Sequence, residues 1–106
     1  MTDTLPDKVV DKAADDRLAL YDALLSLKTR EELDAFLADL CTPSELRAFA
    51  ERWAVARLLD QHLHSYREIA AEAGASPTTV VRVARFLREM PHQGYRLVLD
   101  RLKQKD

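Results

Sequence analysis

Apolar and polar positions along much of the chain repeat with the spacing of an α-helix. Between residues 77 and 89, Val80, Ala84 and Leu87 recur at intervals of four and three, whereas Thr78 falls on the opposite side. Residues three or four apart share one face of a helix, so this segment is predicted to be amphipathic. Only two of the 106 residues are glycine. An all-α chain is therefore expected, since a β-sandwich or barrel needs many tight turns.

Helix-start signals recur along the chain. Thr29, Thr42 and Ser65 each stand three residues before a glutamate, which is the spacing of a capping box. In such a box the glutamate carboxylate reaches back to the amide of the capping residue, so Glu32 is expected to bond the Thr29 amide. A serine–proline pair at 76–77 marks a fourth start, because proline is well suited to the first helical position.

These signals, together with a break at Pro91, predict six helices. They are expected at 8–27, 30–40, 43–61, 66–73, 77–89 and 92–103. Residues 1–7 are expected to form a mobile N-terminal tail, and residues 8–106 a single helical domain.

The predicted helices carry more apolar faces than one small chain can bury. In the segment 43–61, Phe49 and Trp53 lie on one side and Val55 and Leu59 on the other. A helix that is apolar all round is buried on most sides, yet a domain of this size buries only about 60–65% of its chain surface. The surplus favours a helical-bundle homodimer, because two-fold dimers are the commonest oligomers. The alternative is a compact monomeric bundle.

Charge is distributed unevenly around a net value of −2. Residues 1–40 carry ten acidic and five basic side chains, whereas residues 41–106 carry eight acidic and eleven basic ones. A positive excess in one part of a chain favours a polyanionic partner, such as DNA, for that part.

Several classes of protein are not expected. No run of about 18 apolar residues is present, so no membrane partner is predicted. The single cysteine, Cys41, excludes a disulfide framework and fits a cytoplasmic location. His62 and His64 lack a third ligand, so no metal is expected. No phosphate-binding loop or nucleophile elbow occurs, so the chain is expected not to be an enzyme and to need no cofactor.

The stretch YREIAAEAGASPTTVVRVAR, residues 66–85, has the features of a helix–turn–helix. Ala70 provides a small residue where the two helices approach, and Gly74 a residue that accepts a positive φ at the turn. The positions expected to pack inward are Ile69, Ala73, Ala75, Val80 and Val83. A helix–turn–helix is therefore predicted over 66–89. The alternative is a corner between two helices that binds nothing.

The outward side of this motif is predicted to read double-stranded DNA. The N-terminal residues of a recognition helix enter the major groove. The amides at Pro77–Val80, less the proline, are expected to be free and to favour a phosphate. The residues expected at the DNA are Arg67, Ser76, Thr78, Thr79, Arg82 and Arg85. A homodimer would present two such helices to a pseudo-palindromic operator with half-sites about one helical turn apart. The alternative is a protein-interaction module in which these side chains are only solvated.

Two segments resemble the Trp repressor family, in particular its Trp-repressor-related members of the YerC/YecD type. They are LCTPSELRAFAERWAVARLL at 40–59 and SYREIAAEAGASPTTVVRVARFLREMP at 65–91, and the resemblance extends over about residues 14–103. It implies six helices whose outer members interlace between two subunits, and a sequence-specific transcriptional repressor. It also implies that Arg88 contacts phosphate.

The resemblance further implies a ligand pocket, because the family's repressor is switched by L-tryptophan. Thr42, Arg52, Thr79 and Arg82 match the ligand-contacting positions in residue type. Two other pocket positions depart from the family pattern, with Val83 in place of glycine and Phe86 in place of serine. Side chains of this bulk are expected to fill the space that an indole needs, because overpacking a site costs about 1–3 kcal/mol. The pocket is therefore expected to be vestigial, with a tryptophan-responsive repressor as the alternative.

Overall fold

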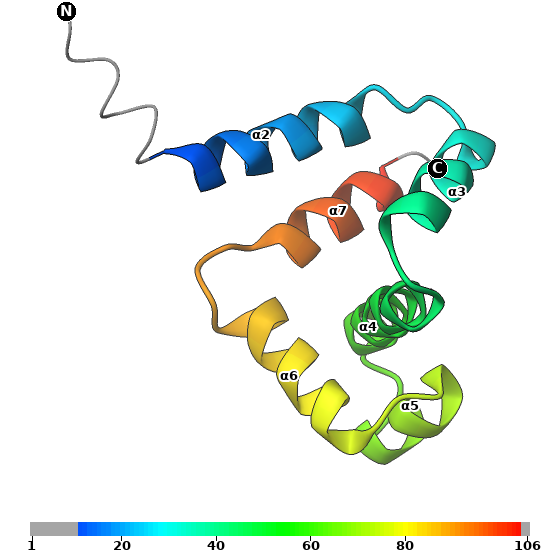
Figure 1. The fold of residues 1–106 in the computed structure, drawn as a ribbon. Coiled ribbons are helices and arrows are strands. Elements are labelled where there is room, and N and C mark those ends of the chain that lie inside the picture. Colours follow the sequence, from blue (N-terminus) through cyan, green and yellow to red (C-terminus); the bar gives the residue numbers. More distant parts are fainter. Residues whose placement is uncertain (1–10, 105–106) are drawn as a thin grey trace, which may run out of the picture. The chain divides into compact units, whose positions relative to one another are not determined.

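The protein is all-helical over residues 11–104, the part that this computed structural model describes. Six helices occur there and no strand (Figure 1). They are α2 (Lys12–Leu25), α3 (Arg30–Leu40), α4 (Pro43–Gln61), α5 (Tyr66–Ala73), α6 (Pro77–Arg88) and α7 (Gly94–Lys103). The predicted all-α class and the number of helices are confirmed.

The helix boundaries follow the predicted ones closely. The predicted ends of α3, α4 and α5 are those observed, and α6 ends one residue earlier than predicted. α7 begins at Gly94 rather than at residue 92, because Gln93 adopts a left-handed φ of 56° and its side-chain amide donates to the Met90 carbonyl at 2.8 Å. α2 ends at Leu25 instead of residue 27. Its predicted start and the predicted tail at 1–7 lie outside the described residues.

The chain divides into two compact units, residues 1–42 and residues 43–106. The single domain predicted over 8–106 stays a prediction. In the first unit, neither α2 nor α3 contains a buried residue. Leu18 and Leu25 of α2 are exposed to solvent, and Leu25 is 82% exposed.

The capping of α3 differs from the prediction in one contact. The Thr29 hydroxyl accepts from the Glu32 amide at 3.1 Å, as expected. The Glu32 carboxylate, however, accepts from the Lys28 amide at 2.8 Å, so the bond predicted to the Thr29 amide is wrong. The carboxylate thus satisfies a donor four residues back instead of three, and this donor lies outside the helix.

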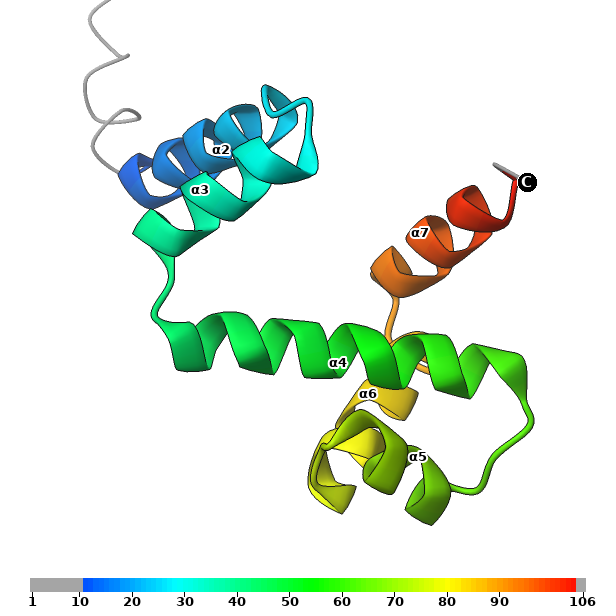
Figure 2. The same cartoon turned by 90° about the vertical axis from the view of Figure 1, so that its right-hand side faces the viewer.

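The second unit holds a single apolar core built around α4. Figure 2 shows α4 crossing this unit, with α5 and α6 on one side and α7 on the other. The core residues come from all four helices and are Val55, Ala56, Leu59, Ile69, Val80, Val83, Ala84, Leu87 and Leu99. The expectation that α4 is buried on most sides is not met within one chain, since Phe49 is exposed and Trp53 is half-buried.

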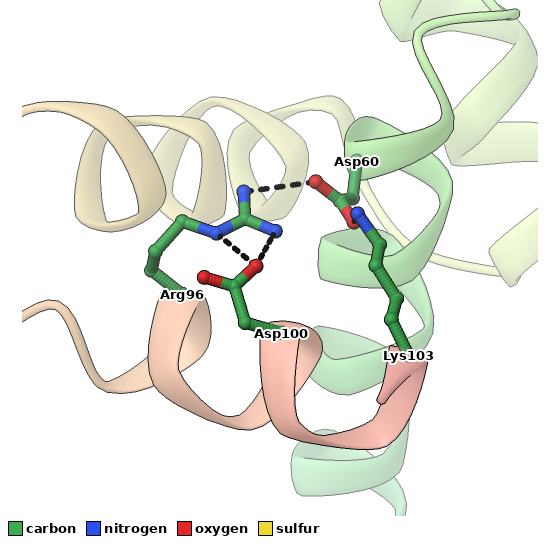
Figure 3. Close-up of polar contacts among 4 residues, drawn as sticks. All are labelled: Asp60, Arg96, Asp100 and Lys103. Carbon is green, nitrogen blue, oxygen red and sulfur yellow. Dashed lines mark hydrogen bonds and ion pairs between the residues drawn. The ribbon is translucent and has the colours of Figure 1, made fainter. Parts of the chain in front are cut away.

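Ion pairs fasten α7 to the C-terminal end of α4 (Figure 3). The Asp60 carboxylate accepts from the Arg96 guanidinium and from the Lys103 ammonium, each at 2.9 Å. Arg96 also holds Asp100 on its own helix at 2.8 Å. Hydrogen bonds from Arg96 and then Lys103 lower the pKa of Asp60 to about 2. Hydrogen bonds to Asp60 and then to Asp100 raise the pKa of Arg96. Asp60 and Arg96 therefore stay charged at neutral pH.

Replacing Asp60 by asparagine is expected to lower the free energy of unfolding by about 1–2 kcal/mol at pH 7. This loss in the free energy of unfolding is limited because Lys103 is exposed and solvent screens its charge. A lowered pKa means that the carboxylate stabilises the fold above its ordinary value of 3.8 and loses this contribution as the pH falls toward about 2. Urea unfolding of both proteins at several pH values measures the difference. A difference that stays constant down to pH 2 would contradict the assignment.

Candidate nucleic-acid interface

A tight connection at residues 74–76 fixes the angle between α5 and α6. α5 begins with a full capping box, in which Ser65 and Glu68 satisfy each other's amides at 3.2 and 2.8 Å. The bond from the Ser65 amide lowers the pKa of Glu68, so this carboxylate stays ionised. α5 ends at Gly74, whose φ of 67° suits a residue without a side chain. The Ala75 amide then donates to the Ala70 carbonyl at 3.0 Å, which closes the turn.

The inward faces of the two helices pack as the apolar pattern predicts. Ile69 of α5 and Val80 and Val83 of α6 are buried in the core. The small residues Ala70, Ala73 and Ala75 pack against that core and are partly buried. Ile69, Val80 and Val83 anchor the two helices in one core with α4. The opposite face of α6 is therefore held outward.

That opposite face carries three of the predicted site residues. Thr78, Arg82 and Arg85 are all exposed, and they lie three or four residues apart on α6. Spacing of this kind places side chains on one face of a helix. The arrangement offers one hydroxyl and two guanidinium groups to a partner outside the chain.

The first turn of α6 is capped by its own hydroxyl groups. The Ser76 hydroxyl accepts from the Thr79 amide at 3.1 Å and lies 3.0 Å from the Thr79 hydroxyl. The Val80 amide donates to the Ser76 carbonyl. Of the amides expected to be free for a phosphate, those of Thr79 and Val80 are therefore engaged, and that expectation is wrong for them. The Thr78 amide is the one in this turn without a partner among residues 11–104.

One aromatic ring supports both exposed arginines of α6. The Arg82 guanidinium carbon lies 4.4 Å from the centroid of the Phe86 ring, and that of Arg85 lies 5.9 Å from it. The His92 ring stacks with Phe86 at a centroid distance of 6.1 Å. Cation–π attraction holds a guanidinium near a ring without neutralising its charge. Phe86 therefore limits the positions of Arg82 and Arg85 while leaving their donors available.

Of the two remaining predicted arginines, Arg88 contacts the start of α5 and Arg67 belongs to that helix. Arg88, at the end of α6, donates to the Tyr66 hydroxyl at 3.2 Å. Arg67 follows Tyr66 in the same turn of α5 and is exposed. The hydrogen bond between Arg88 and Tyr66 thus joins the end of α6 to the start of α5.

The six residues of the predicted ligand pocket come from both units of the chain. Thr42 belongs to the first unit, and the other five to the second. The Arg52 guanidinium lies 5.4 Å above the Phe49 ring, and Thr79 takes part in the cap of α6. Val83 is buried in the core, whereas Phe86 is half-buried.

A hollow of about 480 Å³ in the second unit has Arg82 and Phe86 in its wall. The other residues lining it are Trp53, His92, Gly94, Tyr95 and Val98. The Trp53 and Tyr95 rings stack at 6.4 Å, so the wall is largely aromatic. Phe86 therefore forms one side of the hollow without filling it.

Sequence reasoning missed one member of the outward face. Val81 is 56% exposed, whereas Val80 beside it is fully buried. A valine in an apolar run is ordinarily assigned to the core. The signal that could have found it is its position, three residues after Thr78 and four before Arg85, which places it among the polar residues of α6.

Two other types of site are absent from residues 11–104. No helix in this range combines the length and apolar character that crossing a bilayer requires. No three or more histidine, cysteine or acidic side chains converge there in a way that could hold a metal ion.

The chain is similar to several bacterial proteins. An uncharacterized protein of Bacillus subtilis (strain 168), YerC, is 41% identical over 85 residues, which is 80% of either chain. A candidate Trp repressor from Staphylococcus aureus shares 40% identity, with a TM-score of 0.76 over 86% of this chain and 87% of the other. A TrpR-like protein from Eubacterium eligens shares 36% identity, with a TM-score of 0.78 over 92% of this chain and 95% of the other.

These likenesses extend over nearly the whole chain and include both the core of the second unit and the α5–α6 pair. Residues 16–103 also match the family model described as Trp repressor protein. The chain therefore belongs to the Trp repressor family.

Proposed function

We propose that this protein is a sequence-specific DNA-binding transcriptional regulator that acts as a repressor. In this proposal α5 and α6 form a helix–turn–helix, and α6 is the recognition helix that enters the major groove. Family membership supports the proposal, as do the likenesses to a candidate Trp repressor and a TrpR-like protein. A repressor acts on double-stranded DNA, so no catalytic group is needed.

The observation that carries the proposal is the two-sided character of α6. Its inner side is fixed by four buried apolar residues, Val80, Val83, Ala84 and Leu87. Its outer side holds a hydroxyl and two ring-supported guanidinium groups in the open. Arginine donors can bind the edge of guanine or a phosphate, and a threonine hydroxyl can bind either bases or phosphates. Arg67 and Arg88 are suited to the phosphates at the edge of the site.

A search for the bound sequence tests the proposal. Purified full-length protein is mixed with sheared genomic DNA at low salt, and the retained fragments are sequenced. We expect enrichment of a pseudo-palindromic sequence, because two symmetric recognition helices read two half-sites. Fragments retained without a shared sequence would mean phosphate binding alone. Retention of no fragment at low salt would favour a protein-interaction module instead.

The reading of two half-sites requires a homodimer, and the apolar surface supports one. α2 and α3 contain no buried residue, and large apolar side chains such as Leu18 and Leu25 are exposed. The second unit presents the aromatic hollow and an exposed apolar side of α7 that includes Val98 and Leu102. Apolar patches on this scale mark association sites. We assign them to a second copy of the chain.

Replacing Leu25 by alanine is expected to raise the dissociation constant of the dimer by about tenfold, or about 1.4 kcal/mol. The physical reason is the loss of an apolar side chain that the partner covers. Sedimentation velocity over a range of protein concentrations measures the shift, starting from a wild type at twice the 12.1 kDa chain mass. The control is Leu63→Ala, which removes a leucine that is 74% exposed in the connection before α5. A wild type that stays single at high concentration would refute the dimer.

L-tryptophan is expected to bind weakly or not at all, so that the repressor acts without this co-repressor. The Arg82 guanidinium already contacts the Phe86 ring, and the Val83 side chain is buried in the core. An indole that stacked on Arg82 would have to displace Phe86, at a cost of about 1–3 kcal/mol. Isothermal titration calorimetry measures this directly. Saturable heat at micromolar L-tryptophan would overturn the expectation and favour a tryptophan-responsive repressor.

A further inference from the structure

Val81 is an exposed apolar side chain on the outward side of α6, beside the polar residues of that face. Along the helix it lies between Thr78, three residues before it, and Arg85, four residues after it. Arg82 is its immediate neighbour. Val80 and Val83, by contrast, are buried in the core. Val81 therefore is not part of the core of its own unit, and it lies on the side where the proposed recognition helix would meet its partner.

The chemistry of valine restricts what this position can contact. The side chain has no hydrogen-bonding group, so it can bind neither a phosphate nor the donors and acceptors on a base edge. Its two methyl groups are stiff at χ1, so little rotamer freedom is lost on binding. In the major groove the one apolar group on the four bases is the C5-methyl group of thymine. A valine on a major-groove face therefore matches that group and no other base feature.

We propose that Val81 is a specificity-determining residue that contacts the C5-methyl group of one thymine in each half-site. The inference rests on the proposed function and deepens it, because it names a base that the operator must contain. Thr78 and Arg82 supply the polar contacts on either side. Val81 adds discrimination between thymine and the bases that lack this methyl group.

The test removes the methyl group from the DNA instead of changing the protein first. Each thymine of the selected operator is replaced in turn by deoxyuridine, which keeps base pairing and loses only the C5-methyl group. Fluorescence anisotropy then gives the dissociation constant for full-length wild type. At one symmetry-related pair of thymines, the replacement is expected to weaken binding by about fourfold in one half-site and by about fifteenfold in both. Each buried methyl group contributes the same increment of binding free energy.

Three variants separate Val81 from other sources of the effect. Val81→Ala is expected to lose the discrimination, so that thymine and deoxyuridine operators bind equally well. Val81→Thr keeps one of the two methyl groups and is expected to retain part of the preference for thymine over deoxyuridine. Leu63→Ala removes an exposed leucine outside the outward face of α6 and is expected to retain the full preference for thymine. Circular dichroism confirms that each variant is folded.

The possible results distinguish this inference from the function it rests on. If wild type binds the operator and no thymine is sensitive to deoxyuridine, the assignment of Val81 is wrong. The same holds if Val81→Ala shows the full deoxyuridine penalty, because the methyl group would then be read by another residue. If wild type selects no DNA sequence at all, the proposed function fails and this inference fails with it.

Discussion

Replacing Arg82 by alanine is expected to weaken binding to the selected operator by about 1–3 kcal/mol. The guanidinium is exposed, lies in the N-terminal half of α6 and is held 4.4 Å above the Phe86 ring, so its donors are positioned before the DNA arrives. A guanidinium that is already held in place can donate two hydrogen bonds to the O6 and N7 atoms of guanine with little loss of side-chain entropy. Fluorescence anisotropy on the operator and on a random duplex of equal length measures both affinities.

The comparison between the two duplexes decides what Arg82 contacts. A loss on the operator alone indicates base recognition, whereas an equal loss on random DNA indicates contact with phosphate. Arg101→Ala is the matched control, because it removes the same charge from an exposed position in the last turn of α7. Operator affinity that does not change in Arg82→Ala would show that this residue is wrongly placed at the DNA.

The second large effect is expected in stability. Replacing Ile69 by alanine is expected to lower the free energy of unfolding by about 2–5 kcal/mol, because the cavity left in a packed core adds to the lost apolar burial. Ile69 is only 1% exposed and is the one core residue that α5 contributes. Small domains have total stabilities of about 5–15 kcal/mol, so the loss is a large fraction of the whole. Urea unfolding followed by circular dichroism measures it.

Two further variants define the scale of that effect. Ile69→Val removes a single methylene group and is expected to cost about 0.5–1.5 kcal/mol. Leu63→Ala changes an exposed side chain and is expected to stay within about 0.5 kcal/mol of wild type. If Ile69→Ala cost no more than Leu63→Ala, α5 would not be anchored to α4 and α6 as described.

Most of the helix boundaries could be predicted because the signals that set them are local. The cap at Ser65, the left-handed turn at Gly74 and the serine–proline start of α6 involve residues only a few positions apart. Their hydrogen bonds depend little on the rest of the fold. The same local reasoning failed at Glu32, where two neighbouring amides compete for one carboxylate and either bond satisfies a donor.

Contacts between distant segments could not be predicted. Asp60 and Arg96 are 36 positions apart, and no periodic pattern relates a charge on α4 to one on α7. The contact between Arg82 and Phe86 is local, because the two residues lie four positions apart on α6. It was not predicted because Phe86 was expected to fill a ligand pocket. The exposure of Val81 was missed because hydrophobicity alone does not distinguish a core residue from an apolar residue at a binding surface.

The sharing of one ring by two guanidinium groups makes Arg82 and Arg85 interdependent. Both draw on the negative faces of the Phe86 ring, at 4.4 and 5.9 Å. Removing one guanidinium leaves the ring to the other, so the losses from the two single alanine variants should not sum to the loss from the double variant. In the proposed regulator, a change of sequence preference is therefore expected to involve both arginines, because both contact one ring.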